Sequence, residues 1–388
     1  MEGMIFLSSY YTTLVIITIT AMIVSIIHLF ENQTLHRRVK HQLIFVSSLI
    51  ILGITCEFLG IYLNNIPSAN ISIFHSCIKA IEFTVTPIIP ASYITIIDYK
   101  NHKKFSNFFM ILLLIINTFL EFININMPFI FYIDENNIYK HGSCYFIYIF
   151  IYSIEIAIFI FELLRHTKKY QVRNIATLIS ILAFLLIGLS VRLIDSAIYT
   201  DWLIVAITYL LFVIYYSDLS LKVDPLTDLL NRKSYEYKLK KLDYTTAIIL
   251  LDVDQFKQTN DKYGHQAGDN LLKLISRTII KAYGKYGYCY RIGGDEFCVI
   301  LKSKVIENFL NKNPSATYSD FLDDLNKNFD DLLLTYYEKH PSLKSSVSKG
   351  YSIFYGTNNY ENSYKYSSSV EKAIKLADEK MYENKKGK

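Results

Sequence analysis

The segment 293–296 reads Gly-Gly-Asp-Glu and lies between two short apolar runs, 288–292 and 297–301. Two β-branched and aromatic runs joined by a glycine-containing turn predict a β-hairpin. The glycines permit a tight turn that another molecule can approach closely. Two carboxylates side by side at its tip repel each other unless a cation lies between them, so the segment favours a divalent metal site. A solvent-exposed turn of the same composition is the alternative.

A second acidic position precedes this hairpin in the chain. Residues 245–252 form a continuous apolar run that ends at Asp252, and such a run predicts a buried strand. A carboxylate at the end of a buried strand is well placed to bind a metal ion. The polar segment 260–269, which contains Asn260 and Asp269, is predicted to be a loop. Their side chains either cap this loop or bind a ligand.

The rest of the C-terminal part alternates helices and strands. We expect a helix that ends near Lys241, further helices at 270–282, 318–338 and 368–384, and a strand at 345–354. Strands and helices that interleave around a hairpin are typical of an α+β fold of the ferredoxin-like kind. In this fold the hairpin tip would lie beside the end of the 245–252 strand.

Composition divides the chain of 388 residues into two unlike parts. Hydrophobic residues make up 52% of the chain, whereas the last third has an ordinary mixture of acids and bases. The net charge of +5 is small and does not indicate nucleic-acid binding. Five cysteines without CxxC spacing indicate neither a zinc site nor a disulfide scaffold.

The apolar part contains seven stretches near the length of about 20 residues that crosses a bilayer. They are 5–29, 42–64, 73–98, 105–126, 144–164, 174–195 and 200–217. Lys and Arg residues concentrate in the first, third and fifth loops, at 37–40, 100–104 and 165–173. By the positive-inside rule the N-terminus is then outside and the C-terminal domain is in the cytosol. We therefore expect an all-α bundle of seven membrane spans.

Several ionisable residues lie within the predicted spans, where charges usually face a bundle interior or a water-filled cavity. Alternating span directions place four of them at overlapping depths in the outer half, namely Glu57, Lys79, Glu82 and Arg192. We expect a polar cluster that is open to the outside and is a candidate sensing pocket for an unknown ligand. A structural ion-pair network between the helices is an equal alternative.

Residues 218–223 are the whole linker between the membrane domain, 1–217, and the C-terminal domain, 224–388. A linker of this length is too short to be a flexible tether. We expect it to continue the seventh helix, so that movement in the membrane reaches the next domain mechanically.

Four motifs in the C-terminal domain resemble those of the GGDEF domain of diguanylate cyclases. Residues 224–232 are similar to the family's D-x-L-T-x-L-x-N-R, 252–257 to D-x-D-x-F-K, 260–269 to N-D…G-H…G-D, and 293–297 to the GGDEF signature. The resemblance covers about residues 222–388. It implies a domain that joins two GTP molecules into cyclic di-GMP and releases two pyrophosphates. The predicted spans ahead of it resemble, in architecture only, the seven-helix sensor regions of some bacterial histidine kinases and cyclases.

The resemblance implies roles for the acidic residues. Asp252, Glu296 and the backbone carbonyl of Val253 would hold Mg²⁺ or Mn²⁺, two ions per active site, and Asp295 would be the general base. Carboxylate oxygens suit these hard cations, which neutralise phosphate charge. The 3′-hydroxyl of one GTP would attack the α-phosphate of a second GTP on a facing domain. The resemblance therefore implies a homodimer formed through the cyclase domain.

Other residues would bind the substrate. The resemblance assigns Asn260 and Asp269 to guanine, because a carboxylate accepts hydrogen bonds from the N1–H and N2 amino donors that adenine lacks. It also implies substrate contacts by Phe256, Lys257, Gly293, Gly294 and Lys385.

Three features depart from the family pattern. Gly284 and Gly287 stand where the inhibitory R-x-x-D motif would have its charged residues, so we expect no feedback through that motif. The sequence reaches Lys388 without the family's Gly-Arg-Asn, so we expect reduced triphosphate affinity. Lys349 replaces a usually apolar strand residue, which we expect to perturb packing rather than chemistry.

The sequence thus predicts a homodimeric diguanylate cyclase in the cell membrane of a bacterium, regulated through its spans. One alternative is a receptor whose cyclase domain binds GTP but turns it over weakly. A second alternative is a transporter with a regulatory domain, which the absence of an evident internal repeat disfavours.

Overall fold

The computed structural model describes residues 2–64, 66, 71–97, 104–169, 175–194, 199–312, 317–339, 345–356 and 369–387. Within some of the helices, side chains also lie outside the description, including that of Arg192. The chain divides into two compact units, Met1–Leu219 and Ser220–Lys388. Each unit is described by itself.

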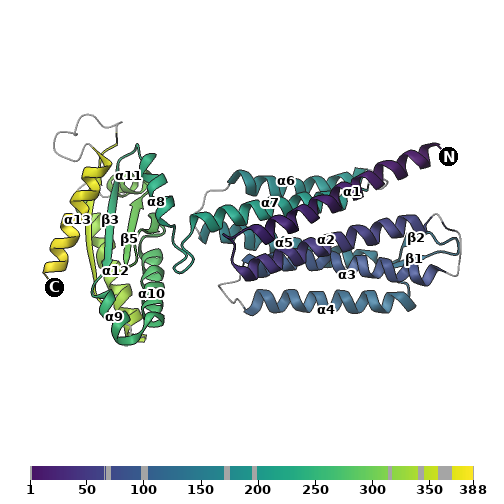
Figure 1. Cartoon of the computed structure of the whole chain (residues 1–388), viewed down its shortest axis with the longest axis horizontal. Coiled ribbons are helices and arrows are strands. Elements are labelled where there is room, and N and C mark those ends of the chain that lie inside the picture. The colour runs from purple at the N-terminus through teal and green to yellow at the C-terminus, as the bar shows by residue number, and fades with distance from the viewer. Residues whose placement is uncertain are drawn as a thin grey trace. The chain divides into compact units, whose positions relative to one another are not determined.

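The first unit is a bundle of long helices that lie side by side (Figure 1). In the described residues these helices are α1 Glu2–Glu31, α2 Arg37–Leu63, α3 Ser72–Ile97, α4 Lys104–Asn126, α5 Tyr145–Lys169, α6 Ile175–Ile194 and α7 Asp201–Lys222. Within the described residues, all of them except α6 are long and apolar enough to cross a membrane. α6 coincides with the sixth predicted span, whose side chains are described only in part. The count of seven spans therefore stays a prediction.

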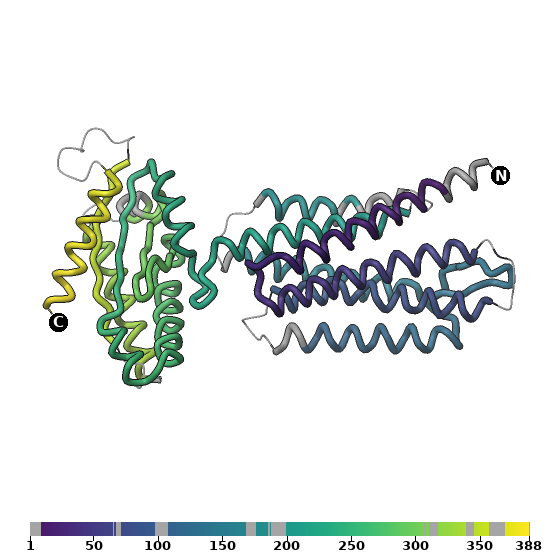
Figure 2. Tube along the Cα trace, in the orientation of Figure 1, coloured from purple at the N-terminus to yellow at the C-terminus, as the bar shows by residue number. Residues whose placement is uncertain are grey.

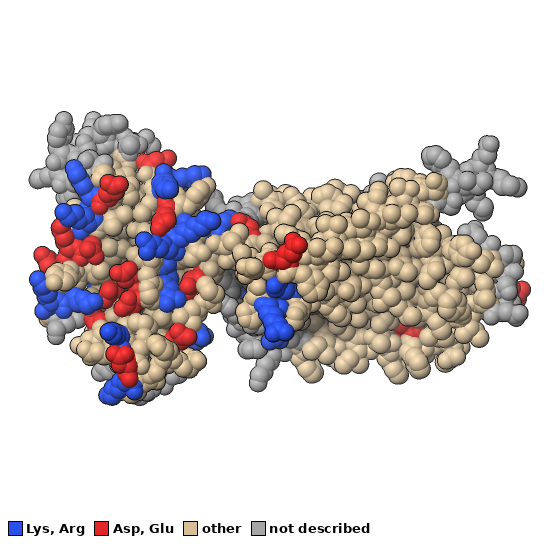
Figure 3. Space-filling model, viewed as in Figure 1, with Lys and Arg blue, Asp and Glu red and all other residues tan. Residues whose placement is uncertain are grey.

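The outer surface of this helical unit is apolar. Large apolar side chains such as Ile16, Ile23 and Phe119 are exposed on its helices. Figure 3 shows that the visible face of the unit is almost uncharged between its ends. A soluble protein rarely exposes so continuous an apolar surface, so these helices suit the interior of a bilayer.

A short hairpin, which the sequence analysis did not predict, lies at one end of the helical unit. Strand β1, Phe131–Ile133, pairs with β2, Tyr139–His141, in antiparallel register. Asn124 at the end of α4 anchors the hairpin, because its Oδ1 accepts hydrogen bonds from Phe129 N and Ile130 N at 2.9 and 2.7 Å. Strands of three residues carry too weak a sequence pattern to be recognised.

The second unit is built on a four-stranded antiparallel sheet in the order β4-β5-β3-β6. The strands are β3 Thr246–Val253, β4 Gly287–Arg291, β5 Glu296–Leu301 and β6 Val347–Phe354. The predicted hairpin at 288–301 is confirmed as β4–β5. All eight residues of β3 are buried, because the sheet is covered on both faces.

Helices pack on both faces of this sheet (Figure 2). α10 His265–Tyr283 and α12 Tyr318–Lys339 share an apolar core with alternate residues of β3 and β5. α13 Val370–Lys386 packs on the other face, where the Ser352 hydroxyl of β6 donates to the Ala373 carbonyl at 2.5 Å. α8 Arg232–Lys240 and α11 Ser303–Lys312 are further helices of this unit.

The segment 260–269 is helical, so the prediction of a loop is wrong. α9 spans Phe256–Tyr263 and α10 begins at His265, with only Gly264 between them. Gly264 has φ 83° and ψ 160°, a conformation that is available almost only to glycine. The polar residues that suggested a loop lie at the end of α9 and the beginning of α10, on either side of this glycine.

Lys349 is accommodated by the core rather than perturbing it. Its ammonium pairs with Asp330 of α12 and donates to the Asn326 carbonyl at 3.2 Å. The side chain is 11% exposed and also lies over the Phe329 ring. A lysine is tolerated at this inward position because its charge is paired while its stem covers apolar surface.

We expect replacement of Gly264 by alanine to destabilise the second unit by about 1–3 kcal/mol, because a Cβ disfavours this backbone conformation. Hydrogen exchange of the β3 amides in the full chain measures the effect as a lower free energy of opening. Gly387→Ala is the matched control, since Gly387 has φ −79°. Equal effects of the two substitutions would show that the conformation of Gly264 is not the cause.

Candidate active site and buried polar cluster

The Gly-Gly-Asp-Glu segment forms the turn between β4 and β5. Arg291 pairs with Phe297, and the amides of Ile292 and Gly293 both donate to the Glu296 carbonyl, at 2.9 and 3.3 Å. A Cβ at Gly293 would lie 2.3 Å from Glu296 Oε2, so the carboxylate lies against the glycine backbone. At Gly294 a Cβ would meet nothing within 4 Å. The turn thus offers open backbone next to an exposed carboxylate.

The sheet register brings Asp252 opposite Glu296. Asp252 is the second-last residue of β3, and its Cα partner in β5 is Glu296. Directly opposed residues in an antiparallel pair project to the same face. The next amide, that of Val253, donates to the Asp295 carbonyl at 3.2 Å. The predicted acidic residues from two distant segments therefore meet at one sheet end.

Lys385 of α13 reaches the same place. Its ammonium lies 2.6 Å from Asp252 Oδ1 and forms an ion pair with it. This hydrogen bond is the main reason why the pKa of Lys385 lies above its ordinary value, and the nearby charges of Asp254 and Asp295 act in the same direction. The position concentrates negative charge, as a cation site requires.

The residues at this end of the sheet are chemically suited to bind a divalent cation. Among the described residues no group of three His, Cys, Asp or Glu side chains converges, but Asp252 and Glu296 present hard oxygens to the same face. A backbone carbonyl at the end of β3, such as that of Val253, suits the same ion. These two side chains and the carbonyl are the residues that would hold it.

The two predicted guanine residues lie on consecutive helices. Asn260 is on α9, and Asp269 follows Gly268 in the second turn of α10. A Cβ at Gly268 would lie 1.9 Å from Asn260 Oδ1 and 3.2 Å from the Phe256 ring, so these three residues are in contact. The Asn260 Oδ1 is buried and has no hydrogen-bond partner among the described residues. An acceptor in this state is suited to a ligand donor.

A large hollow lies on the other side of α9. It has a volume of about 860 Å³ and is lined by residues that include Gln255, Thr259 and Lys385, together with parts of α12 and β6. Neither Asn260 nor Asp269 is among the described residues that line it. Lys257 is exposed at the start of α9. The structure therefore brings Lys385 to the acidic end of β3 but keeps the predicted guanine residues on the opposite side of α9.

Residues 221–388 match the family profile described as diguanylate cyclase, GGDEF domain. This part of the chain is similar to a GGDEF domain.

The chain is 37% identical over 99 residues to the diguanylate cyclase DgcS of Shewanella oneidensis, a match that covers 23% of this chain and 33% of the relative. It is 41% identical over 85 residues to the probable diguanylate cyclase DgcJ of Escherichia coli, covering 20% and 17%. The chain thus matches a third or less of the length of these curated relatives. The crystal structure of the GGDEF domain of DgcB from Caulobacter crescentus in complex with c-di-GMP is 22% identical, covers 43% of this chain and 91% of that chain, and has a TM-score of 0.32.

Arg291 holds the GGDEF turn to the start of the domain, a role that the sequence analysis did not assign. Its Nη1 lies 3.1 and 3.3 Å from the two carboxylate oxygens of Asp224. Its Nε and Nη2 donate to the Gly294 carbonyl at 3.2 and 2.7 Å. Asp224 also accepts from the Thr227 amide and hydroxyl. The first motif of the GGDEF domain therefore fixes the backbone of its signature.

The second aspartate of the 252–257 motif has a structural role. Asp254 is buried, and its two carboxylate oxygens accept hydrogen bonds from Ser346 and Ser348 at 2.5 and 2.6 Å. These bonds join the end of β3 to the start of β6. Spacing alone could not distinguish this residue from the candidate ligand Asp252, because both follow the same apolar run.

In the helical unit, the structure brings three of the four predicted sensor residues together. Glu57 of α2 accepts from the Tyr11 hydroxyl at 2.6 Å, and Lys79 pairs with Glu82 of the same helix at 2.8 Å. A Cβ at Gly60 of α2 would lie 2.7 Å from Lys79 Cε, so Lys79 crosses from α3 onto α2. The side chain of Arg192 lies outside the described residues.

The cluster is closed rather than open, which differs from the sequence-based expectation. Glu57, Lys79 and Glu82 are each less than one-tenth exposed, and the Tyr139 ring of the β1–β2 hairpin lies 5.0 Å from the Lys79 ammonium. The hairpin residue Asn137 contacts His75 of α3 at 3.3 Å. Sequence reasoning missed this cover because it depends on the unpredicted hairpin.

We expect the Arg291–Asp224 pair to stabilise the GGDEF domain with a coupling energy of about 1–2 kcal/mol in a double-mutant cycle of Arg291→Gln and Asp224→Asn. The two side chains are only 15% and 18% exposed, so water screens the pair little. Hydrogen exchange of the β4 and β5 amides measures the four free energies.

The exposed pair Arg232–Glu236, at 73% and 54%, is the matched control. Its coupling energy should be about 0.3–0.5 kcal/mol. Equal coupling in the two pairs would contradict a special role for Arg291.

Proposed function

We propose that this chain is a membrane-anchored diguanylate cyclase that joins two GTP molecules into cyclic di-GMP and releases two pyrophosphates. The observation that carries the proposal is the opposition of Asp252 and Glu296 across β3 and β5, in a segment that matches the GGDEF family. Relatives that carry the name of this activity support it. We also infer that the β3-α10-β4-β5-α12-β6 order is ferredoxin-like.

The chemistry is a displacement at phosphorus. The 3′-hydroxyl oxygen of one GTP forms a bond to the α-phosphorus of another, the bond to the bridging oxygen breaks, and pyrophosphate leaves. Asp295 lies in the turn beside this position and takes the hydroxyl proton. Lys257 and Lys385 offset charge on the phosphates, and the open backbone at Gly294, next to Gly293, lets the phosphates approach.

When bound, two Mg²⁺ or Mn²⁺ ions at Asp252, Glu296 and the Val253 carbonyl would supply further charge neutralisation. Asn260 and Asp269 hold guanine, and Asn260 Oδ1, which has no hydrogen-bond partner among the described residues, accepts from the base. One domain holds one GTP. Joining two therefore requires two facing domains, and we propose a homodimer through the GGDEF domain.

The helical unit supplies the anchor and the signal. We propose seven spans with the N-terminus outside and the GGDEF domain in the cytosol, because basic residues gather in the odd loops. We also propose that the buried cluster of Glu57, Lys79 and Glu82, with Arg192, responds to an extracytoplasmic or membrane ligand. A ligand that competes for the Lys79–Glu82 pair would shift the packing of α2 against α3. α7 extends to Lys222, and we propose that it transmits movement in the membrane to the GGDEF domain.

One observation favours weak turnover as a second candidate function. The Lys385 ammonium pairs with Asp252, and a metal ion must displace it to use both carboxylate oxygens. A chain in which this pair persists would bind GTP and signal through binding alone.

The deciding experiment incubates the purified full chain, in detergent or nanodiscs, with GTP and Mg²⁺ and identifies the products by mass spectrometry. We expect cyclic di-GMP, and we expect Glu296→Gln to lower turnover about 100-fold or more, because a charged group at the reaction centre is lost.

Glu379→Gln, an exposed change on α13, is the matched control and should leave turnover intact. If the wild-type chain binds GTP but forms no cyclic di-GMP, the result would favour a receptor that binds GTP without turning it over. Undiminished product from Glu296→Gln would refute the metal assignment.

We expect Asp269→Asn to remove guanine recognition. Inosine triphosphate lacks the N2 amino group, so the wild-type chain should prefer GTP to it by about 10–100-fold in kcat/KM, the value of a hydrogen bond to a charged group. Asp269→Asn should abolish most of this preference, whereas Asp261→Asn, an exposed neighbour on α9, should keep it. A preference that survives Asp269→Asn would place guanine elsewhere.

A further inference from the structure

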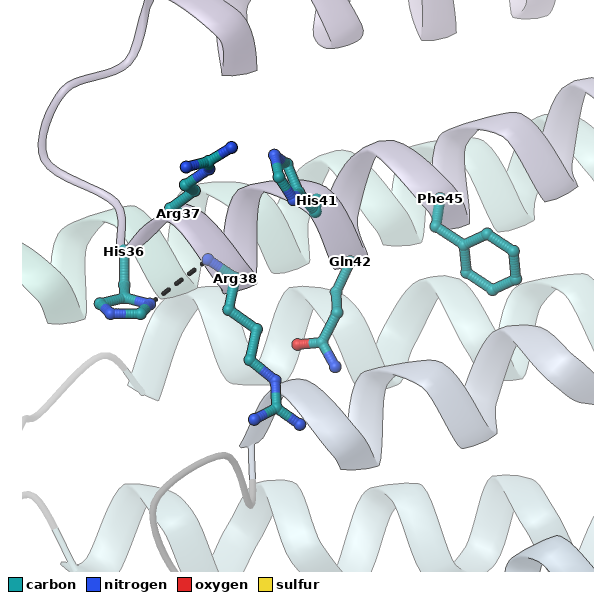
Figure 4. Close-up of a pocket in the computed structure, with 6 residues that line it drawn as sticks. All are labelled: His36, Arg37, Arg38, His41, Gln42 and Phe45. Carbon is teal, nitrogen blue, oxygen red and sulfur yellow. Dashed lines mark hydrogen bonds between the residues drawn. The ribbon is translucent and has the colours of Figure 1, made fainter.

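A carboxyl group lies buried in the middle of the helical unit, where the proposed cyclase activity makes no use of it. Glu155 follows Tyr145, the first residue of α5, by about 15 Å along the helix axis. Its side chain is fully buried, and neither Oε1 nor Oε2 has a hydrogen-bond partner among the described residues. Figure 4 shows a different situation for Arg37 and Arg38 at the beginning of α2, where both are exposed beside a hollow of about 580 Å³.

Two aromatic contacts fix the alignment of α5 with α3. The ring of Phe83 of α3 stacks on that of Tyr148 of α5, with 4.4 Å between the centroids. Further along both helices, the rings of Tyr93 and Phe159 are 5.0 Å apart. The contacts follow each other in the same order along the two helices, so α3 and α5 run parallel. Glu155 therefore lies one turn before the contact of Tyr93 with Phe159.

α7 joins the same aromatic contact and also runs parallel to α5. The ring of Phe212 of α7 lies 4.6 Å from that of Tyr93 and 6.1 Å from that of Phe159. Further along, His166 Nδ1 of α5 lies 3.2 Å from the Tyr215 hydroxyl of α7. One turn before the three rings, α3, α5 and α7 are therefore neighbours at a common depth.

Two hydroxyl groups at this depth are buried in the same state as the carboxyl group. Thr208 precedes Phe212 by one turn of α7, and its Oγ1 has no hydrogen-bond partner among the described residues. The Tyr93 hydroxyl has none either. Helical side chains lean towards the helix N-terminus, so Tyr93 extends from the ring contact towards the level of Glu155. In agreement, the Tyr93 hydroxyl interacts electrostatically with Tyr152, which lies almost one turn before Glu155.

These surroundings decide the charge state of Glu155. The titratable groups around it in the described part of the bundle are Tyr152 on its own helix, Tyr93 on α3, and Tyr209 on α7, which interacts with Tyr93. None of the three is a cation. A buried carboxylate with neither a cation nor a hydrogen-bond donor is strongly disfavoured. A proton removes the charge and needs no added volume between the packed rings.

We propose that Glu155 is a proton-binding site of the helical unit and is a carboxylic acid while α3, α5 and α7 are packed as described. Loss of the proton leaves a carboxylate that requires hydrogen-bond donors, and the hydroxyls of Tyr93 and Thr208 are available. To bring them to the carboxylate, α3 and α7 must shift against α5. Because α7 continues to Lys222, the shift reaches the start of the second unit. The site itself depends neither on the cyclase activity nor on the number of spans.

Infrared spectroscopy of the full chain in nanodiscs tests the charge state, because the C=O stretching band of a carboxylic acid is distinct from the bands of a carboxylate. At neutral pH we expect Glu155→Gln to remove an acid band from the wild-type spectrum. Glu162→Gln, farther along α5, is the matched control and should remove carboxylate bands instead, since Glu162 pairs with Arg165 at 3.1 Å. Loss of carboxylate bands in Glu155→Gln would overturn the proposal. An acid band that sodium ions abolish would also overturn it, because a metal ion would then be the ligand.

Hydrogen exchange of the α7 amides tests the coupling to α7. The packed state holds the proton, so a rise in pH should favour the shifted state. After correction for the intrinsic exchange rate, we expect the opening equilibrium of the wild-type chain to rise by up to about tenfold per pH unit at alkaline pH, as one proton is released. Glu155→Gln, which has no proton to release at this position, should remove the rise, and Glu162→Gln should keep it. The same rise in Glu155→Gln would refute the coupling.

The wild-type chain alone provides a second test that remains valid if Glu155→Gln does not fold. Its acid band should decrease over the same pH range in which exchange of the α7 amides increases. An increase in exchange while the acid band stays constant would contradict the proposal.

Discussion

The antiparallel pairing of β5 with β3 is the constraint on which the geometry of the candidate active site depends. Its register places Asp252 opposite Glu296, and the alternation of side chains then sends both carboxylates to the face covered by α13. A slip of one residue would turn Glu296 towards the apolar core beneath α10 and α12. The register is held because Phe297, Val299 and Leu301 of β5 fill that core together with Ala247, Ile249 and Leu251 of β3. Burial of apolar side chains thus fixes the position of the charged ones.

Polar side-chain contacts then fix the positions of the turn and of the strand ends. Arg291 links Asp224 to the Gly294 carbonyl, and Asp254 links β3 to two serines of β6. These bonds lie at the same end of the sheet as the two opposed carboxylates. Partly buried charge pairs of this kind resist screening by water and fix geometry. The turn can therefore remain open at Gly294 while its backbone is held from one side.

The helical unit differs from the second unit because its outer surface is apolar. Its charged residues lie either inside the bundle or at its ends. Lys79 and Glu82 are buried as a pair, and Glu57 is bonded to Tyr11. Unpaired charges at this depth would be costly in a bilayer. At the end where α2 begins, Arg37 and Arg38 are exposed.

The sequence by itself determined the helical unit, the β4–β5 hairpin, the buried strand that ends at Asp252, and the motifs that mark the GGDEF domain. These features depend on local periodicity and on residue types at fixed spacing. Tertiary structure alone decided that 260–269 is helical about Gly264, that Lys385 reaches Asp252, that Asp254 is bound to serines, and that a hairpin closes the cluster around Lys79. The last three depend on contacts between residues far apart in the chain. Local sequence states which groups are present, but only packing states which of them meet.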